Sequence, residues 1–306
     1  MRKKRLRTVL VCGVPSLAAA LFVWTAAAEA GAHYRPEYER ADLEAILCKE
    51  MPDEEDYAVL FRQTGLGRSG VEELFRQGRQ GELLSLQERF FARVEYECFQ
   101  ANAVCRSERL TGAAGAAQEI GDFMPTVQTG DILVTFSGHF FGWRSGHAGI
   151  VVDAESGQTL EAVMPGLSSE ICTLDQWGRY PCFVLLRLKD ATAEETAAIA
   201  AYAKENLADI PYDLFSFTEG GKEIRRPGQG DMPGTEQPSG QKVASEPVSG
   251  TQCAHLVWLA FAHFGYDLDG DGGYVVTPAD LCGSELLEVV QIYGIDPCAK
   301  EISGGV

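Results

Sequence analysis

A histidine in a short β-rich run and a cysteine at the start of an apolar run are the residues of this sequence best suited to covalent chemistry. His147 lies in the run 146–152, and Cys253 leads into the apolar residues 256–258. A thiol is a strong nucleophile as its thiolate, and an adjacent imidazole can take its proton. The two residues therefore predict the nucleophile and the base of a cysteine hydrolase, with the histidine first in the chain.

A carboxylate is available to orient this histidine. The turn composition around Ala154 predicts a β-hairpin centred there, in which Glu161 lies directly opposite His147 on the same face. The carboxylate would then accept a hydrogen bond from the imidazole and stabilise the imidazolium. Gly146 and Gly149 leave space beside the ring. A slip of one residue would move the carboxylate to the other face, leaving only a buried histidine with a chance neighbour.

The cysteine is predicted to open a helix that is capped by Thr251 or Ser249 and stops at Gly265. At this position the helix dipole and the free backbone N–H groups favour a thiolate. The thiol of Cys253 lies at the N-terminal end of an apolar stripe that is suited to packing on a sheet. This stripe comprises Leu256, Val257, Ala260 and Phe264. The alternative is an inert buried cysteine. Joined with the histidine and the carboxylate, the helix completes the set that nucleophilic catalysis requires.

Around these residues the sequence predicts an α+β fold in three parts. Residues 1–30 form a signal peptide or membrane anchor, 31–120 a helical N-terminal region, and 121–298 the hydrolase domain, with a flexible insertion at 219–250. Short β-rich runs are expected at 131–136, 147–152, 159–164 and 183–188, followed by a helix at 192–207. The N-terminal region carries no catalytic constellation, so it is a packing subdomain, a partner-binding subdomain or a cover for the site.

Charge and targeting signals narrow the class of protein. The formal net charge of −18 disfavours nucleic acid, whose phosphates need Lys and Arg. The basic residues 2–7 and the uncharged, mostly apolar residues 8–28 have the pattern of a secretory signal, with an uncleaved membrane anchor as the rival. Both predict a secreted or cell-envelope protein outside the cytoplasm.

Eight cysteines follow the predicted signal, and export permits disulfides among them. Cys172 with Cys182, and Cys282 with Cys298, are candidate pairs by their closeness in sequence. The alternative is that several are buried thiols. If Cys253 itself were tied in a disulfide, the site would be structural.

With these residues in view, the chain resembles the YiiX-like cysteine hydrolases, the circularly permuted branch of the NlpC-type papain-like superfamily. The matching segments are 130–133, 146–151, 160–162, 211–213, 253–258 and 277–281. The resemblance covers roughly residues 125–295. It implies a permuted papain-like core, in which an antiparallel sheet packs on the cysteine helix. It also implies Cys253 as nucleophile, His147 as base, Glu161 as the orienting residue and Tyr212 near the nucleophile, where it polarises the substrate carbonyl.

The sequence departs from this family at the residue before the nucleophile. NlpC-type peptidases commonly have Asp there and use it to bind a peptide amine, whereas this chain has Gln252. We therefore expect Gln252 and Tyr212 in the substrate-binding site. The substrate of the NlpC-type peptidases, however, is not carried over to this chain. The safest prediction is hydrolysis of an amide or ester through a thioester, first on cell-wall peptides and second on acyl lipids. A catalytically silent binding module of the same fold is the alternative from another class.

Two further groups could carry chemistry. The acidic run 267–272 looks like the start of a calcium loop, but an EF-hand needs a bidentate Glu at its twelfth position, which is Pro278 here. An acidic turn is the preferred interpretation. His139 is expected on a loop over the site or in a structural or surface role. No metal-ligand spacing links the remaining histidines to cysteines, so no metal and no cofactor are predicted. The sequence does not give the oligomeric state.

Overall fold

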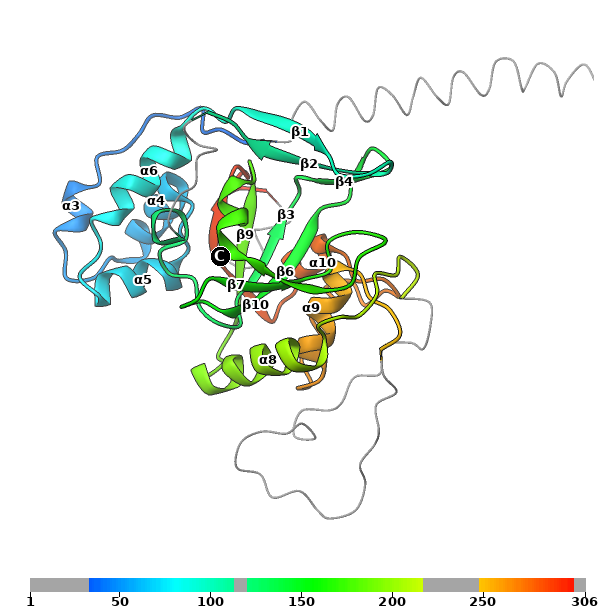
Figure 1. Ribbon diagram of the computed structural model, residues 1–306. Helices are drawn as coiled ribbons and strands as arrows, with labels where there is room; N and C mark the ends of the chain where they lie inside the picture. Colours follow the sequence, from blue (N-terminus) through cyan, green and yellow to red (C-terminus); the bar gives the residue numbers. More distant parts are fainter. Residues whose placement is uncertain (1–32, 113–119, 217–247, 300–306) are drawn as a thin grey trace, which may run out of the picture. The chain divides into compact units, whose positions relative to one another are not determined.

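The computed structural model describes residues 33–112, 120–216 and 248–299. The chain divides into a unit of residues 1–34 and a unit of residues 35–306, and every helix and strand below belongs to the second unit. This unit has an α+β fold with two antiparallel sheets and several helices (Figure 1). The predicted signal segment and nearly all of the predicted insertion lie outside the described residues. Among the described helices, none is long and apolar enough to span a membrane.

The larger sheet has six strands in the order β10-β9-β3-β6-β7-β8. Its strands are β3 (Ile132–Thr135), β6 (His147–Asp153), β7 (Gln158–Glu161), β8 (Glu170–Thr173), β9 (Phe183–Leu188) and β10 (Leu287–Tyr293). The runs expected at 131–136, 147–152 and 183–188 are confirmed, and the run at 159–164 becomes a strand that ends at Glu161. Neither edge strand was predicted, because β8 is largely exposed and β10 is separated from its partner by about a hundred residues.

A second sheet corrects the prediction that residues 31–120 are helical. Its strands are β1 (Tyr96–Gln100), β2 (Cys105–Leu110), β4 (Gly138–Phe140) and β5 (Trp143–Arg144), in that order. The turn between β1 and β2 is closed by the side chain of Asn102, which accepts the N–H groups of Val104 and Cys105. The predicted helix at 83–98 is thus helical only up to Phe91, and its last residues, from Tyr96, join β1, which pairs with β2.

The helices of the N-terminal region form one group at the β10 edge of the larger sheet (Figure 1). They are α3 (Glu44–Leu47), α4 (Glu54–Thr64), α5 (Arg68–Arg76) and α6 (Glu82–Phe91). Their backbone touches β10 directly, since Gly67 N–H donates to Val290 O at 2.7 Å and Ile292 N–H donates to Gly65 O at 2.7 Å. A Cβ atom at Gly67 would lie 2.0 Å from Val289 O, so this approach requires glycine.

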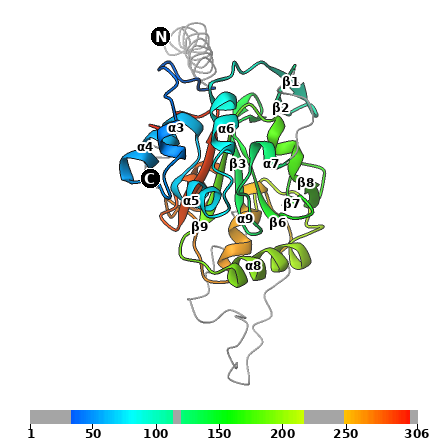
Figure 2. The same cartoon turned by 90° about the vertical axis from the view of Figure 1, so that its left-hand side faces the viewer.

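Two long helices cover the centre of the larger sheet. The helices α8 (Ala193–Asn206) and α9 (Cys253–Ala262) pack against β6 and against each other (Figure 2). A capping box at Thr192 and Glu195 begins α8 where the sequence predicts it. Residues 147–152 of β6 are all buried, so both faces of this strand are covered.

A separate core layer packs against the larger sheet. It is built around the 3₁₀ helix η2 (Leu174–Arg179) and the short helix α7 (Ile120–Phe123). Trp177 of η2 is fully buried in a cluster that includes Leu133, Val151 and Leu185 from β3, β6 and β9. A short helix, α10 (Pro278–Cys282), contacts α9 and β3.

A buried ion pair at the start of β3 provides the first test of this architecture. The guanidinium of Arg187 contacts both carboxylate oxygens of Asp131 at 2.8 Å, and the side chain of Asp131 is 2% exposed. Replacing Asp131 by Asn removes the closer of two carboxylates from the buried guanidinium and leaves only the longer ion pair with Glu73 at 3.6 Å, so we expect a loss of about 3–5 kcal/mol in the free energy of unfolding. Urea denaturation measures this loss. Glu54→Gln, which breaks the exposed pair with Arg68, is the control and should change stability little. Equal effects of the two substitutions would contradict the role assigned to the buried pair.

Candidate active site

The three residues predicted to act together lie at the ends of three elements. His147 is the first residue of β6, Glu161 is the last residue of β7, and Cys253 is the first residue of α9. All three are buried, with exposed fractions of 7%, 6% and 8%. Nε2 of His147 lies 2.7 Å from Oε2 of Glu161, and the side chain of Cys253 is close enough to the same histidine to raise its pKa. Since Nε2 faces the carboxylate, Nδ1 is the ring nitrogen left for the sulfur.

The predicted register of the β6–β7 hairpin is wrong by two residues. Ile150 pairs with Leu160 and Val151 with Thr159, with a bulge before Asp153. His147 and Glu161 are therefore a diagonal pair and not a directly opposed one. A shift of two residues leaves both side chains on the same face, so the predicted hydrogen bond still forms.

Gly149 makes this diagonal contact possible. A Cβ atom built on Gly149 would lie 2.9 Å from Cγ of Glu161 and 3.3 Å from Cζ2 of Trp177. The space predicted beside the imidazole is thus filled by the two side chains that hold it. Gly146 has a different role, because its φ of +75° is a left-handed turn leading into β6.

Trp177 and Thr159 complete the site, and sequence reasoning missed both. Oε1 of Glu161 accepts hydrogen bonds from Nε1 of Trp177 at 2.8 Å and from Oγ1 of Thr159 at 2.5 Å. The indole also stacks on the ring of His147, with 5.6 Å between centroids and 14° between planes. The period-two alternation that places Glu161 also places Thr159 on its face. Nothing in the sequence pattern indicates Trp177, which comes from η2.

The electrostatics of the pair favour a charged histidine. Burial alone would lower the pKa of His147, but its hydrogen bonds to Cys253 and Glu161 raise the pKa well above its ordinary value. Burial acts in the opposite direction on Glu161, yet the hydrogen bond from His147 holds the pKa of this carboxyl below its ordinary value. The site therefore holds a carboxylate beside an imidazolium at neutral pH.

The start of α9 presents the sulfur and a set of backbone donors. Cys253 is the first helical residue, so its N–H group is among those that no turn of the helix satisfies. The cap is Gln252 and not Thr251 or Ser249, because the side-chain oxygen of Gln252 accepts the N–H of Ala254 at 2.9 Å. The sulfur lies 3.5 Å from this same oxygen. The amide nitrogen of Gln252 donates to Val276 O, so the predicted substrate contact of Gln252 stays a prediction.

Tyr212 pairs with the segment that leads into Cys253. Its backbone forms a bridge with Thr251, and its N–H donates to Leu167 O at 2.9 Å. Burial, and then the electrostatic influence of the thiols of Cys253 and Cys105, raise the pKa of Tyr212 above its ordinary value. The hydroxyl therefore stays protonated and is available as a donor near the sulfur.

The expected disulfides do not form among the described cysteines. No disulfide joins any two of the eight described cysteines, so neither predicted pair forms, and Cys253 is a free thiol. Cys182 is buried against Ser137, whose Oγ lies 3.2 Å from its sulfur. Burial, followed by the charges of Glu161 and Glu170, raises the pKa of Cys172 to about 12. Cys182 is therefore a buried thiol, the alternative that the sequence left open, whereas Cys172 is half-buried.

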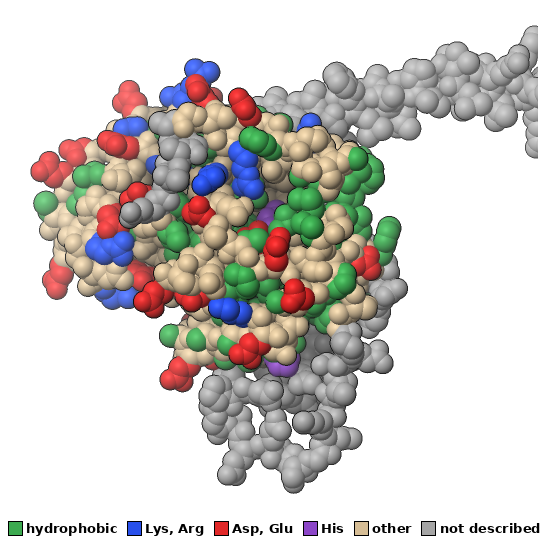
Figure 3. All heavy atoms as spheres, viewed as in Figure 1, with side chains coloured by type: hydrophobic (Ala, Val, Ile, Leu, Met, Phe, Trp, Pro, Cys, Tyr) green, Lys and Arg blue, Asp and Glu red, His purple; other side chains and the backbone are tan. Residues whose placement is uncertain are grey.

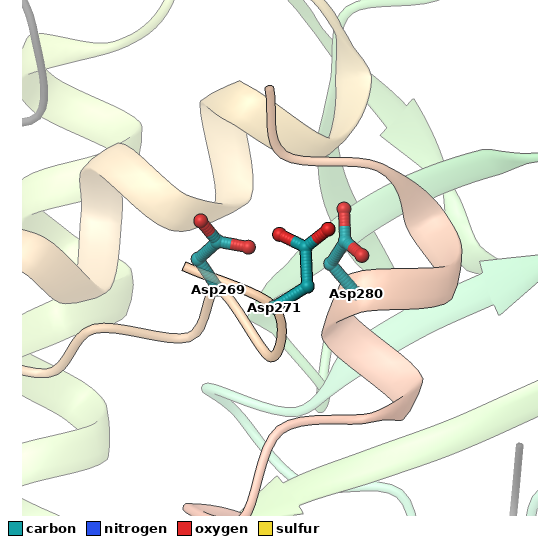
Figure 4. A group of neighbouring side chains, drawn as sticks. All are labelled: Asp269, Asp271 and Asp280. Atoms are coloured by element: carbon teal, nitrogen blue, oxygen red, sulfur yellow. The ribbon is translucent and has the colours of Figure 1, made fainter. Parts of the chain in front are cut away.

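His139 and the acidic run are placed away from the proposed chemistry. His139 is buried on β4, where Nε2 lies 3.1 Å from Glu108, so it has a structural role in the second sheet. The carboxylates of Asp269, Asp271 and Asp280 converge, each offering an oxygen within 4.8 Å of the others (Figure 4). Asp280 belongs to α10 and caps it, so the group is not an EF-hand loop.

Comparison with known proteins returns nothing: no protein-family model, no curated protein and no solved structure matches this chain.

The indole N–H of Trp177 should be needed to position the pair. Trp177→Phe keeps an aromatic ring against His147 but removes one donor to the buried carboxylate. We expect a loss of about 1.5–3 kcal/mol in the free energy of unfolding, the usual cost of a hydrogen bond to a charged group. We also expect slower alkylation of Cys253 by iodoacetamide at about pH 6, because the imidazolium beside the sulfur is less well held.

The matched control is Trp258→Phe, which removes the indole donor to Asp267 on the same helix as Cys253. This substitution should cost stability without changing the alkylation rate. A parallel fall in both variants would show that Trp177 acts only through overall stability.

The raised pKa of His147 predicts a pH-dependent contribution to stability. A folded-state pKa above the unfolded value stabilises the protein fully below the unfolded pKa, and this stabilisation is lost as the pH rises through the folded pKa. The difference in unfolding free energy between the wild type and His147→Gln should therefore shrink as the pH rises above about 6.5, the ordinary histidine pKa. Guanidinium denaturation across this range measures it. A difference that stays constant or grows would refute the charged pair.

Proposed function

We propose that the protein is a cysteine hydrolase that cleaves an amide or ester bond through a thioester intermediate. The observation that carries this proposal is the buried convergence of a thiol, an imidazole and a carboxylate from three separate elements. A merely structural histidine would not need both a free thiol at a helix start and a fixed carboxylate as its neighbours.

The geometry supports the following reaction. In the reactive form the proton of the Cys253 thiol already resides on His147 as the imidazolium, and the thiolate sulfur attacks the carbonyl carbon of the substrate, so that the C=O electron pair moves to oxygen. Backbone N–H groups in the first turn of α9 and the hydroxyl of Tyr212 stabilise this oxyanion. His147 then gives its proton to the leaving nitrogen or oxygen, and the carbon–heteroatom bond breaks to leave a thioester.

Water completes the cycle. His147 takes a proton from water as the oxygen attacks the thioester carbon, and the sulfur leaves as the carboxylic acid product forms. Glu161 remains ionised throughout and holds the tautomer and orientation of the imidazole, as the aspartate does in a Ser-His-Asp triad.

The permuted papain-like arrangement is part of this proposal. The features that support it are the histidine preceding the cysteine in the chain, the antiparallel sheet that carries the histidine, and the packing of α9 on β6. Export to the cell envelope remains a prediction of residues 1–30, and cell-wall peptides remain the first substrate expected from that location.

Alkylation provides the test that does not require the substrate. Cys253 should react with iodoacetamide at about pH 6, where ordinary thiols react slowly. His147→Ala should abolish this reaction, and peptide mass mapping can follow the exposed thiol of Cys98 in the same samples as an internal reference. Equally slow alkylation of Cys253 in both proteins would instead favour a silent binding module.

A further inference from the structure

We infer that the acyl part of the substrate is a long, uncharged hydrocarbon chain, which lies on exposed apolar side chains next to Cys253. This inference rests on the proposed hydrolase function and names its substrate class. The surface, here called the apolar patch, comprises Phe141, Trp143, Met164, Leu167 and Phe215.

Four of the five residues are unusually exposed for their type. The exposed fractions are 68% for Phe141, 55% for Trp143, 46% for Leu167 and 66% for Phe215, and Met164 is half-buried. A soluble protein tolerates single exposed apolar residues, whereas a group of large ones beside a reactive site indicates a ligand or partner.

Backbone contacts connect Met164, Leu167 and Phe215 to the segment that precedes Cys253. Leu167 O accepts the N–H of Tyr212, and Tyr212 pairs with Thr251, two residues before Cys253. Leu167 N–H in turn donates to Met164 O. Phe215 follows Asp213, whose N–H donates to Thr251 O at 2.8 Å. These residues therefore border the start of α9.

The β1–β2 turn connects the other residues of the patch. Nδ2 of Asn102 lies 3.4 Å from the sulfur of Met164, and Val104 O accepts the N–H of Phe141 at 2.8 Å. Phe140 pairs with Trp143 across the β4–β5 turn and with Cys105 on β2. The patch thus continues from Leu167 across this turn to the aromatic tip of β4 and β5.

The charge of these segments argues for an uncharged ligand. The patch residues come from the segments 138–143, 162–169 and 211–215, and the connecting turn is 101–105. None of these segments contains Lys or Arg, and Asp213 is the one acidic residue in them. In Figure 3, hydrophobic side chains gather over the end of the second sheet at the right, whereas Lys and Arg lie mainly over the left half. Carboxylates and phosphates bind where Arg or Lys can meet them. A hydrocarbon chain needs no such partner.

The conformation of the aromatic tip supports the same conclusion. Phe141 has φ +49° and Gly142 has φ +81°, the signs of a hairpin turn that favours Asn or Gly at both positions. A large aromatic residue at such a position costs conformational free energy and also exposes its ring to water. Binding of an apolar chain by this ring would offset both costs.

Hydrolysis of p-nitrophenyl esters from acetyl to decanoyl, each below its micelle concentration, tests the inference. For the wild type we expect kcat/KM to rise by about two- to fourfold per added methylene, since each buried CH₂ contributes about 0.8 kcal/mol. The double variant Phe141→Ser/Trp143→Ser should reduce the decanoyl-to-acetyl ratio at least tenfold. Leu84→Ser, at an exposed leucine on α6, is the matched control and should leave this ratio unchanged.

The outcomes separate this inference from the proposed function. Cys253-dependent hydrolysis with no dependence on chain length would overturn the apolar ligand and leave the hydrolase standing. Absence of Cys253-dependent hydrolysis for every ester would overturn the hydrolase. Calorimetry of the binding of decanoate and of acetate to Cys253→Ala measures the contribution of the apolar patch in the absence of catalysis. Binding of decanoate that the double variant loses supports the patch, and equal binding of both acids overturns it.

Discussion

The hydrogen bond between His147 and the buried carboxylate of Glu161 is the interaction on which the site depends. A carboxylate in this environment would be costly if it were left alone, by several kcal/mol. Here three donors surround it, from His147, Trp177 and Thr159. Because these donors stabilise the ionised form, the carboxylate can in turn hold the imidazolium.

The sheet supplies the constraint that brings these groups together. β3 pairs with β6 up to Thr135 and His147, and the chain between them leaves the larger sheet to form β4 and β5 of the second sheet. Gly146 N–H donates to Gly138 O at this junction. A Cβ atom on Gly138 would lie 2.8 Å from Gly146 O, so the two segments can approach only as glycines. His147 thus stands where two sheets meet, and its backbone has little freedom to move away from the carboxylate.

The sequence predicted the parts of this arrangement that depend on periodicity and not those that depend on tertiary partners. Alternation along β6 and β7 fixed the shared face of His147 and Glu161, and this survived the error of two residues in register because the side-chain period of a strand is two. Helix-start signals placed Cys253 correctly, although the capping residue differed. Trp177 could not be predicted, since its position follows from the packing of η2 across the sheet. The β1–β2 hairpin was missed for the same reason, as its second strand is held by β4 from another part of the chain. The predicted disulfides failed because closeness in sequence carries no information about where two side chains point.

The N-terminal region has two roles that the sequence could not separate. Its helices build a core of their own around Leu60, Leu74 and Leu83 and dock on the β10 edge, three strands from His147. Its hairpin instead reaches the site, because Asn102 touches Met164 and the thiol of Cys105 acts on Tyr212. The sulfur, the imidazole and the carboxylate are each less than a tenth exposed. Under the proposed function, the region is therefore a structural support at one end and part of the substrate approach at the other. The residues that select the acyl chain would then come from β4, β5 and the loops after β7 and α8, outside the catalytic set itself.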